Sequence, residues 1–313
     1  MKIAFMGTPH AAVASLDALL RAGHEIAAVY TQPDRPSGRG KKISASPVKE
    51  YALERGLHLE QPQGLRNMEA IEKFRGLRAD AAVVVAYGRI LPQDFLTAFP
   101  LGAINLHFSL LPKYRGAAPV NWALANGETL TGVTTMLMDE GLDTGPILLQ
   151  EKVEIGWRET APHLVDRLSA IGADLLIRTL AEVDQIEPMS QCNDDASYAP
   201  ILRKADGLIN WERPASDICN RVRGFQPYPG SFSYLNGVRA VIWSARPSEE
   251  RADMPTVPGT ILSKSDGVIE VAAGEGTVLR IEELQFEGKR RKSATDALNS
   301  GQIQVGLRFS GVV

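Results

Sequence analysis

Two polar side chains end an apolar run in the stretch AINLHFSLLPKYRGAAP, residues 103–119. Asn105 and His107 are two residues apart, so on a β-strand both would point to the same face. A carboxamide can donate a hydrogen bond to a developing oxyanion, and an imidazole can donate, accept or become cationic near neutral pH. The pair therefore favours transfer of a carbonyl group. The structural alternative is that Asn105 caps a turn and His107 is a hydrogen-bonded core histidine.

A carboxylate that could assist this pair is expected at Asp143. It lies in DEGLDTGP, where two glycines and a proline predict a tight turn between two strand-like runs. A carboxylate beside His107 would fix the tautomer of the ring, or take a proton from an amine nucleophile directly or through water. Asp139 and Glu140 are rivals for this role. A turn aspartate that bonds only its own backbone is the structural alternative.

The elements that must position these residues follow a regular alternation. Short β-rich runs such as KIAFMG, EIAAVYT, ADAAVVVAYG and GAINLHFS alternate with helical patterns such as HAAVASLDALLRAG. Strands that are apolar on both faces, connected by helices, predict an α/β fold with a Rossmann-like, doubly wound parallel sheet. Ligands of such sheets bind beyond the carboxyl ends of the strands. Two further strand-like runs on either side of DEGLDTGP and a helix over residues 160–184 complete this domain.

The second half of the chain has a different pattern. A polar stretch, 189–206, interrupts the periodicity and is expected to link a catalytic domain, 1–188, to a C-terminal domain, 207–313. After it come short strand-like runs separated by LNG and GEG, which are hairpin signals. The C-terminal domain is therefore predicted to be a small, mostly β barrel.

Composition indicates an ordinary globular protein. The chain has 313 residues, 44% hydrophobic and 23% charged, and its net charge of −3 excludes a protein that is basic overall. Apolar runs such as residues 79–87 are shorter than the roughly 18 residues of a membrane span, and MKIAFMGTP lacks the long apolar core of a signal peptide. Cys192 and Cys219 have neither metal-type nor disulfide-type spacing. We expect a cytoplasmic protein.

The sequence lacks the motifs that bind several common cofactors. Gly7 in FMGTP stands alone where a dinucleotide site requires G-x-G-x-x-G, and no G-x-x-x-x-G-K-[ST] is present. The five histidines, at positions 10, 24, 58, 107 and 163, include no pair at i, i+4 spacing. The sequence therefore predicts no nicotinamide, flavin, ATP or metal site.

Two segments concentrate positive charge. RPSGRGKKISASPVK, residues 35–49, has no acidic residue and is rich in Gly, Pro and Ser, which predicts a long basic loop. It is either a solvated linker or a contact for a phosphate backbone. EGKRRKSA, residues 287–294, forms a second, turn-like basic segment. The candidate cations of the two segments are Arg35, Arg39, Lys41, Lys42, Lys289, Arg290 and Arg291.

NLHFSLLPKYRGAAP, followed further on by DEGLDTG, resembles the folate-dependent formyltransferases, which share Asn-x-His, Ser-Leu-Leu-Pro and an Asp in a Gly-rich turn. FMGTP, TQPDRPSGRGKK and DGLINW are similar to the branch of that family that formylates initiator methionyl-tRNA. The likeness covers nearly the whole chain. It implies direct transfer of a formyl group from 10-formyltetrahydrofolate to the amino group of methionyl initiator tRNA, by a monomer that needs no metal.

The resemblance also implies site residues and an OB-like form for the C-terminal barrel. The catalytic trio would be Asn105, His107 and Asp143. The folate pocket would be lined by Arg89, Ile90, Leu91, Ser109, Leu110, Leu111, Pro112, Asp139 and Glu140. The basic loop would enter the acceptor end of the tRNA through Arg35, Arg39, Lys41 and Lys42, and the C-terminal domain, with Lys289, Arg290 and Arg291, would hold the outside of the stem.

The chain departs from the family pattern at two places. The residue between the His and the Ser, usually small, is Phe108, and an acidic and aromatic pair is replaced by His10 and Ala11. Sugar-nucleotide N-formyltransferases and formyltetrahydrofolate hydrolases share the trio, but the basic insert and the β-rich C-terminal half argue against both. A non-catalytic RNA-binding module would leave the trio without a role.

Overall fold

The computed structural model describes residues 1–37, 42–252, 256–263, 267–299, 301 and 303–311. They form two compact units. Unit 1 comprises Met1–Pro119, Leu130–Glu154 and Val165–Ala199, and unit 2 comprises Val120–Thr129, Ile155–Leu164 and Pro200–Val313. The domain limits drawn from the sequence, 1–188 and 207–313, stay a prediction. No helix in the described part of the chain is both long and apolar enough to cross a membrane.

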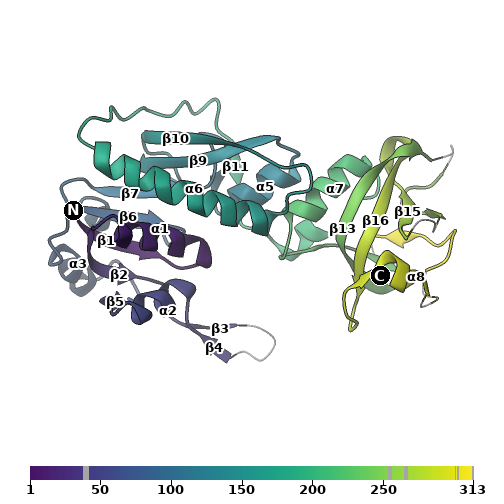
Figure 1. The fold of residues 1–313 in the computed structure, drawn as a ribbon, viewed down its shortest axis with the longest axis horizontal. Helices are drawn as coiled ribbons and strands as arrows, with labels where there is room; N and C mark the ends of the chain where they lie inside the picture. The colour runs from purple at the N-terminus through teal and green to yellow at the C-terminus, as the bar shows by residue number, and fades with distance from the viewer. Residues whose placement is uncertain (38–41, 253–255, 264–266, 300, 302, 312–313) are drawn as a thin grey trace. The chain divides into compact units, whose positions relative to one another are not determined.

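Unit 1 is built on a seven-stranded sheet (Figure 1) with the order β10-β9-β7-β6-β1-β2-β5. Its strands are β1 (Lys2–Gly7), β2 (Glu25–Tyr30), β5 (Leu59–Glu60), β6 (Ala81–Val85), β7 (Ala103–His107), β9 (Leu130–Leu137) and β10 (Ile147–Glu154). The first five pair in parallel, which confirms the predicted fold class. β9 pairs antiparallel with β7, and β10 antiparallel with β9. The sheet is thus mixed at one edge, because a short turn joins β9 to β10 and such turns connect antiparallel strands.

The helices of unit 1 form where the sequence gives them an apolar stripe or a cap. Those wholly within it are α1 (His10–Arg21), α2 (Pro47–Glu54), α3 (Met68–Arg75) and α4 (Gln93–Leu96), and α6 (Ala161–Glu182) lies mainly in unit 1. α1 buries Ala12, Leu16 and Leu19, at helical spacing, as an amphipathic helix does. Ser46 and Asn67 cap α2 and α3 by accepting hydrogen bonds from the first turn. All five residues of β6 are buried, as a strand covered on both faces requires.

The predicted linker is tied into unit 1. β11 (Tyr198–Ala199) pairs in parallel with β8 (Arg115–Gly116), and Met189 forms an antiparallel bridge with Ile147. A side chain on Gly116, whose φ is +118°, would press against the carbonyl oxygen of Ala199. The first part of the polar stretch, through Ala199, therefore belongs to unit 1, and unit 2 resumes at Pro200.

Unit 2 contains an antiparallel sheet with the order β14-β15-β16-β13-β12-β18. Its elements are α7 (Ala215–Gly224), β12 (Ser231–Leu235), β13 (Val238–Arg251), β14 (Ile261–Ser263), β15 (Ile269–Ala272), β16 (Thr277–Phe286), β17 (Lys292–Ser293), α8 (Ala294–Asn299) and β18 (Phe309–Ser310). A bridge between Thr260 and Arg308 joins the two edges of the sheet. Both predicted hairpin turns are confirmed, since LNG joins β12 to β13 and GEG joins β15 to β16.

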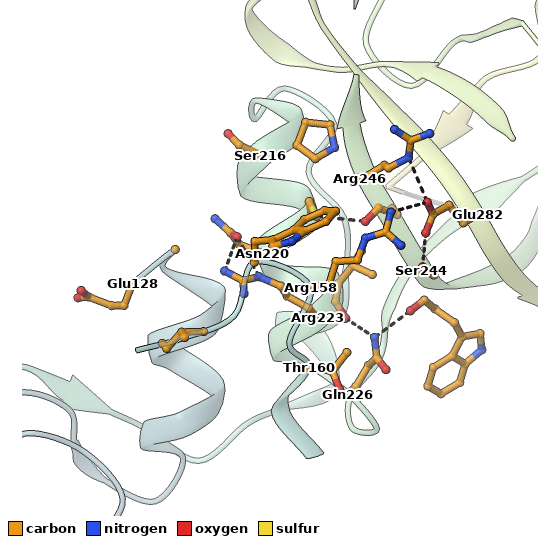
Figure 2. Close-up of a pocket in the computed structure, with 18 of the residues that line it drawn as sticks. Glu128, Arg158, Thr160, Ser216, Asn220, Arg223, Gln226, Ser244, Arg246 and Glu282 are labelled. Atoms are coloured by element: carbon orange, nitrogen blue, oxygen red, sulfur yellow. Dashed lines mark hydrogen bonds and ion pairs between the residues drawn. The ribbon is translucent and has the colours of Figure 1, made fainter. Parts of the chain in front are cut away.

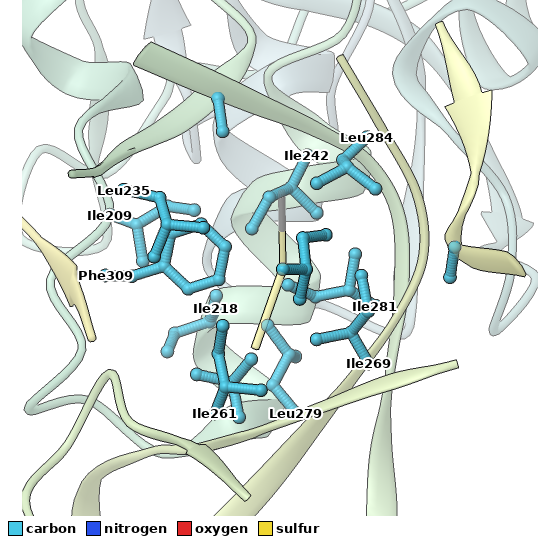
Figure 3. Packing of buried hydrophobic residues seen from close by; sticks show 14 of the residues in the cluster. Ile209, Ile218, Leu235, Ile242, Ile261, Ile269, Leu279, Ile281, Leu284 and Phe309 are labelled. Atoms are coloured by element: carbon cyan, nitrogen blue, oxygen red, sulfur yellow. The ribbon is translucent and has the colours of Figure 1, made fainter. Parts of the chain in front are cut away.

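The curved sheet encloses one apolar core (Figure 3). Ile242, Leu279 and Ile281 come from neighbouring strands and are fully buried there. Trp211 stacks on Phe309 with ring centroids 5.4 Å apart and donates a hydrogen bond from Nε1 to the Ser233 hydroxyl at 3.0 Å. The C-terminal half thus has a hydrophobic core of its own, as the predicted β-rich domain requires.

The remaining short elements are the hairpin of β3 (Arg35–Ser37) and β4 (Lys42–Ser44), helix α5 (Pro119–Ala125), and two 3₁₀ turns over Lys204–Gly207 and Gly274–Gly276.

Candidate active site

Strand β7 places Asn105 and His107 on one face, next to the carboxyl end of β6. Asn105 pairs with Val84 of β6 on one side and Met136 of β9 on the other, and His107 pairs with Thr134. The two residues are only 7% and 6% exposed. The Asn105 carboxamide makes no hydrogen bond to any residue that the structure describes. A buried polar group is normally hydrogen-bonded, so this carboxamide is available to a ligand.

The His107 ring is held from both sides. Nε2 lies 2.9 Å from the main-chain oxygen of Tyr114. Because a carbonyl oxygen only accepts, Nε2 carries a proton and donates it there. Nδ1 faces Oδ2 of Asp143 at 3.7 Å, which is an ion-pair distance and longer than a hydrogen bond. The ring is therefore oriented with its second nitrogen toward a carboxylate.

Asp143 is presented by a constrained turn. Its φ is +54°, in the left-handed region, which Asp tolerates better than most residues. Its Oδ2 accepts a hydrogen bond from the Gly116 amide at 2.8 Å. A side chain on Gly145 would overlap the carbonyl oxygen of Leu137, so this position needs glycine. The Gly-rich turn thus fixes the carboxylate beside His107.

The two rival carboxylates of this turn are placed differently. Asp139 is exposed and accepts from the Thr144 hydroxyl at 2.7 Å and the Gly141 amide at 3.0 Å, so it stabilises the turn itself. Glu140 is also exposed. Of the three candidates, Asp143 is the one that the structure brings to His107.

The predicted folate turn is anchored by side chains of the neighbouring strands. It comprises Ser109, Leu110, Leu111 and Pro112. The Thr134 hydroxyl donates to the Ser109 oxygen at 2.6 Å and accepts from the Leu111 amide at 3.2 Å. Gln150 donates to the Leu111 oxygen at 2.8 Å. The backbone of this turn is therefore fixed next to the carboxyl end of β7.

The other predicted folate segment follows β6, so it starts at the same edge of the sheet. Its three residues differ in environment. Ile90 is 78% exposed, whereas Leu91 is part of the core. The Arg89 guanidinium donates to the main-chain oxygens of Pro62 and Gln63, both at 3.0 Å. Arg89 thus holds a loop in place, and Ile90 presents an apolar surface.

Sequence reasoning missed three residues around this site. Arg115 is almost fully buried, at 2% exposure, and its guanidinium donates to the side-chain oxygens of Gln191 and Asn193. Gln191 in turn donates to the main-chain oxygens of Asp143 and Gly145, at 2.9 and 2.7 Å. Both partners of Arg115 lie in the polar stretch, 189–206, for which the sequence predicts a linker. A buried arginine needs such polar partners, but nothing in the sequence pairs them with it.

Comparison with known proteins shows which family the chain belongs to. Residues 1–180 match the formyl transferase family and residues 201–302 match the formyl transferase C-terminal domain. A methionyl-tRNA formyltransferase of Solibacter usitatus is 49% identical over 305 residues, covering 97% of this chain and 96% of that protein. One of Alkaliphilus oremlandii is 46% identical over 308 residues, covering 98% of each. The chain belongs to the methionyl-tRNA formyltransferase family. It is a formyltransferase enzyme, and the family that the motifs indicated is confirmed.

Solved formyltransferase structures share the fold at low sequence identity. An N-formyltransferase from Helicobacter canadensis, in complex with folinic acid and dTDP-3-aminofucose, superposes with a TM-score of 0.66 at 20% identity, covering 90% of this chain and 98% of that one. HypX from Aquifex aeolicus, in complex with tetrahydrofolic acid, gives 0.64 at 16% identity, covering 97% of this chain and 48% of that one. At such identities the likeness shows the fold alone.

The predicted tRNA-binding cations of this formyltransferase are only partly described. Arg39 and Lys41 lie outside the described residues, and of Lys42 only the backbone, in β4, is described. Arg35 begins β3 and is exposed. Lys289, Arg290 and Arg291 are exposed in the turn after β16, where Arg291 is paired with Glu283 and stacks over Trp243 at 5.3 Å. Of these three exposed cations, Arg291 is partly neutralised by Glu283.

The structure shows where the two departures from the family pattern lie. Phe108 is buried inside unit 1, directly after β7. His10 is the first residue of α1 and is exposed.

Within the described part of the chain, no group of three or more His, Cys, Asp or Glu residues is arranged to hold a metal ion.

A separate cavity of about 410 Å³ lies within unit 2, between α7, β13, β16 and residues 155–160 (Figure 2). Glu282 and two of the arginines that line it form ion pairs. Glu282 accepts from Arg246 at 3.1 Å and from the Ser244 hydroxyl at 2.7 Å, and it lies 3.6 Å from Arg158. Arg223 is held by Asn220. Asn105, His107 and Asp143 all lie in unit 1, whereas this cavity lies in unit 2.

The two cysteines are expected to differ in reactivity. Cys192 is exposed, whereas Cys219 lines the cavity of unit 2 and donates to the Ala245 oxygen at 3.2 Å. Burial raises the pKa of the Cys219 thiol. Each unit of increase lowers the thiolate fraction about tenfold near neutral pH. Brief treatment with iodoacetamide should therefore label Cys192 well before Cys219, which peptide mass spectrometry would measure. Equal labelling rates in the folded protein would contradict this environment for Cys219.

Proposed function

We propose that this chain transfers the formyl group of 10-formyltetrahydrofolate to the free amino group of methionine on initiator tRNA. The observation that carries the proposal is the arrangement of Asn105, His107 and Asp143. A carboxamide with no hydrogen-bond partner among the described residues and an oriented imidazole share one strand face, and a carboxylate lies 3.7 Å from the ring. The proposal includes a cytoplasmic, monomeric enzyme that uses no metal.

The chemistry requires three things of the protein. The attacking amine must be neutral, the formyl oxygen must be able to carry negative charge, and N10 of the folate must leave with a proton. In the proposal the amine nitrogen bonds to the formyl carbon, the bond from that carbon to N10 breaks, and one proton passes from the amine to N10. The amine attacks directly, so no covalent bond to the enzyme forms.

Each residue of the trio has a part in this scheme. Asn105 donates a hydrogen bond to the developing oxyanion, a contribution of about 3 to 4 kcal/mol in comparable sites. His107, with Nε2 bound to the Tyr114 oxygen and Nδ1 facing Asp143, stabilises the oxyanion through its positive charge when both ring nitrogens are protonated. Asp143 orients His107 and accepts the amine proton, directly or through water. The 2.8 Å hydrogen bond from the Gly116 amide to Oδ2 keeps this carboxylate beside His107.

Two features near the trio support folate binding at the carboxyl ends of β6 and β7. Ile90 offers an exposed apolar surface after β6. The turn that starts at Ser109 is fixed by Thr134 and Gln150, so its backbone conformation beside the trio is preorganised. We assign folate binding to this edge of the sheet, with the residues predicted from the sequence.

For the tRNA, we propose that phosphate contacts from the basic segments supply most of the affinity. Arg35, Lys289 and Arg290 are exposed cations on these segments. Binding of this kind weakens steeply with salt, because each neutralised phosphate releases counterions. Formylation at low tRNA concentration should therefore fall as salt is raised.

The test is to follow formyl transfer from 10-formyltetrahydrofolate to three acceptors in parallel. These are methionyl initiator tRNA, the same tRNA uncharged, and an amino-sugar nucleotide. Transfer to the charged tRNA alone is expected, because the acceptor is the free α-amino group. Transfer to the sugar, or hydrolysis of the folate without transfer, would keep the chemistry and overturn the proposed substrate.

A further inference from the structure

The segment that carries Asp143 is held by a residue that is distant in sequence. Gln191 donates both hydrogens of its amide to main-chain oxygens of the Gly-rich turn, those of Asp143 at 2.9 Å and Gly145 at 2.7 Å. Its side-chain oxygen accepts from Nε and a terminal nitrogen of Arg115, at 3.0 and 2.7 Å. Both donor hydrogens of this amide and its oxygen are therefore engaged.

Arg115 lies between two residues whose main-chain groups bind His107 and Asp143. The residue before it, Tyr114, provides the oxygen that binds His107, and the residue after it, Gly116, provides the amide that binds Asp143. The main chain of residues 114–116 therefore holds both members of the His107–Asp143 pair. The Arg115 side chain then reaches the same turn a second time through Gln191.

The bonds between these side chains are stronger than those of neutral amides. A guanidinium that donates to an amide oxygen forms a charge-assisted hydrogen bond, and it polarises the amide so that its N–H groups become better donors. Burial lowers the local dielectric and increases this effect, and Arg115 is only 2% exposed. The turn also needs to be held, because Asp143 has a left-handed backbone conformation.

We propose that Gln191, polarised by Arg115, is a positioning residue for formyl transfer, because it holds the Asp143 turn at the distance from His107 that the reaction needs. This inference rests on the proposed function, and specifically on the part given there to Asp143. It also gives a role in the reaction to the polar stretch 189–206, part of which pairs with unit 1.

Two substitutions separate the bonds of Gln191 from its packing. Gln191→Glu keeps the length of the side chain and the acceptor for Arg115, but it turns a carboxylate oxygen toward two carbonyl oxygens in place of the N–H donors. Gln191→Met keeps the length and removes every hydrogen bond. Gln185→Glu is the matched control, because it makes the same chemical change at an exposed residue shortly before.

The measurements are kcat and KM for both substrates, with thermal unfolding to check that each variant is folded. We expect both Gln191 variants to lower kcat on the order of 100-fold, as a displacement of about 1 Å at a catalytic group does, with KM values close to those of the wild type. Gln185→Glu should match the wild type. In an Asp143→Asn background, Gln191→Glu should cost little more, because the group that it positions is already disabled.

Two results would overturn the inference. One is a folded Gln191 variant with wild-type kcat. The other is an equal fold-loss with and without Asp143, since a residue that only stabilises the structure would act independently of that carboxylate. Absence of formyl transfer by the wild-type enzyme would instead overturn the proposed function, so the two failures are distinguishable.

Discussion

Asn105→Ala should lower kcat for formyl transfer by about 100-fold to 1,000-fold, the loss found when one donor to an oxyanion is removed. The Asn105 carboxamide is buried on β7 and has no hydrogen-bond partner among the described residues, so no contact within the protein accounts for it there. Because the bond to the oxyanion forms only as charge develops, KM for either substrate should change little. Steady-state kinetics with charged initiator tRNA measure both parameters.

Two further variants separate this effect from stability. Asn105→Asp keeps the shape but has no N–H donor when ionised, and it should be at least as impaired as the alanine variant. Asn67→Ala removes the cap of α3, which should cost about 1 kcal/mol of stability and leave kcat unchanged. Full turnover by folded Asn105→Ala would show that the oxyanion is stabilised by other groups.

Asp143→Asn should lower kcat by about 100-fold to 10,000-fold, the range for loss of a general base. Asparagine can still accept from the Gly116 amide, so the turn should keep its conformation while the negative charge beside His107 is lost. Folate and tRNA binding should persist. Rapid-quench measurement of a single turnover isolates the chemical step from product release.

Asp139→Asn is the informative comparison for Asp143→Asn, because sequence patterns alone do not decide which of the two carboxylates assists His107. Asp139 bonds the Thr144 hydroxyl and the Gly141 amide within its own turn. Its substitution should therefore act through turn stability and lower kcat far less than Asp143→Asn. The reverse order would assign the proton transfer to Asp139 and remove Asp143 from the mechanism.

Local sequence patterns predicted the parts of the site that depend on neighbours in the chain. Strand periodicity put Asn105 and His107 on one face, and the glycines of DEGLDTG predicted the turn at Asp143. The LNG turn predicted the β12–β13 hairpin, because Asn236 and Gly237 both tolerate positive φ, at +50° and +74°. These features follow from backbone geometry within a few residues.

The parts that could not be predicted depend on contacts between distant segments. Arg115 and Gln191 are 76 positions apart, and only the folded chain brings them together. The polar residues around Gln191 indicated a solvated linker because polarity is the usual property of loops, yet here they satisfy a buried guanidinium. The antiparallel placement of β9 was likewise missed, since a strand's own composition does not give its direction.

The pairing of β8 with β11 sets a limit on how this enzyme can be divided for domain grafting. A fragment that ended at residue 188 would retain all three proposed catalytic side chains but lose Gln191, Ser197 and β11, which hold the segment that binds His107 and Asp143. An engineered chimera that supplies a different acceptor-binding domain should therefore keep the native chain through Ala199. The transplantable catalytic module is longer than its catalytic motifs.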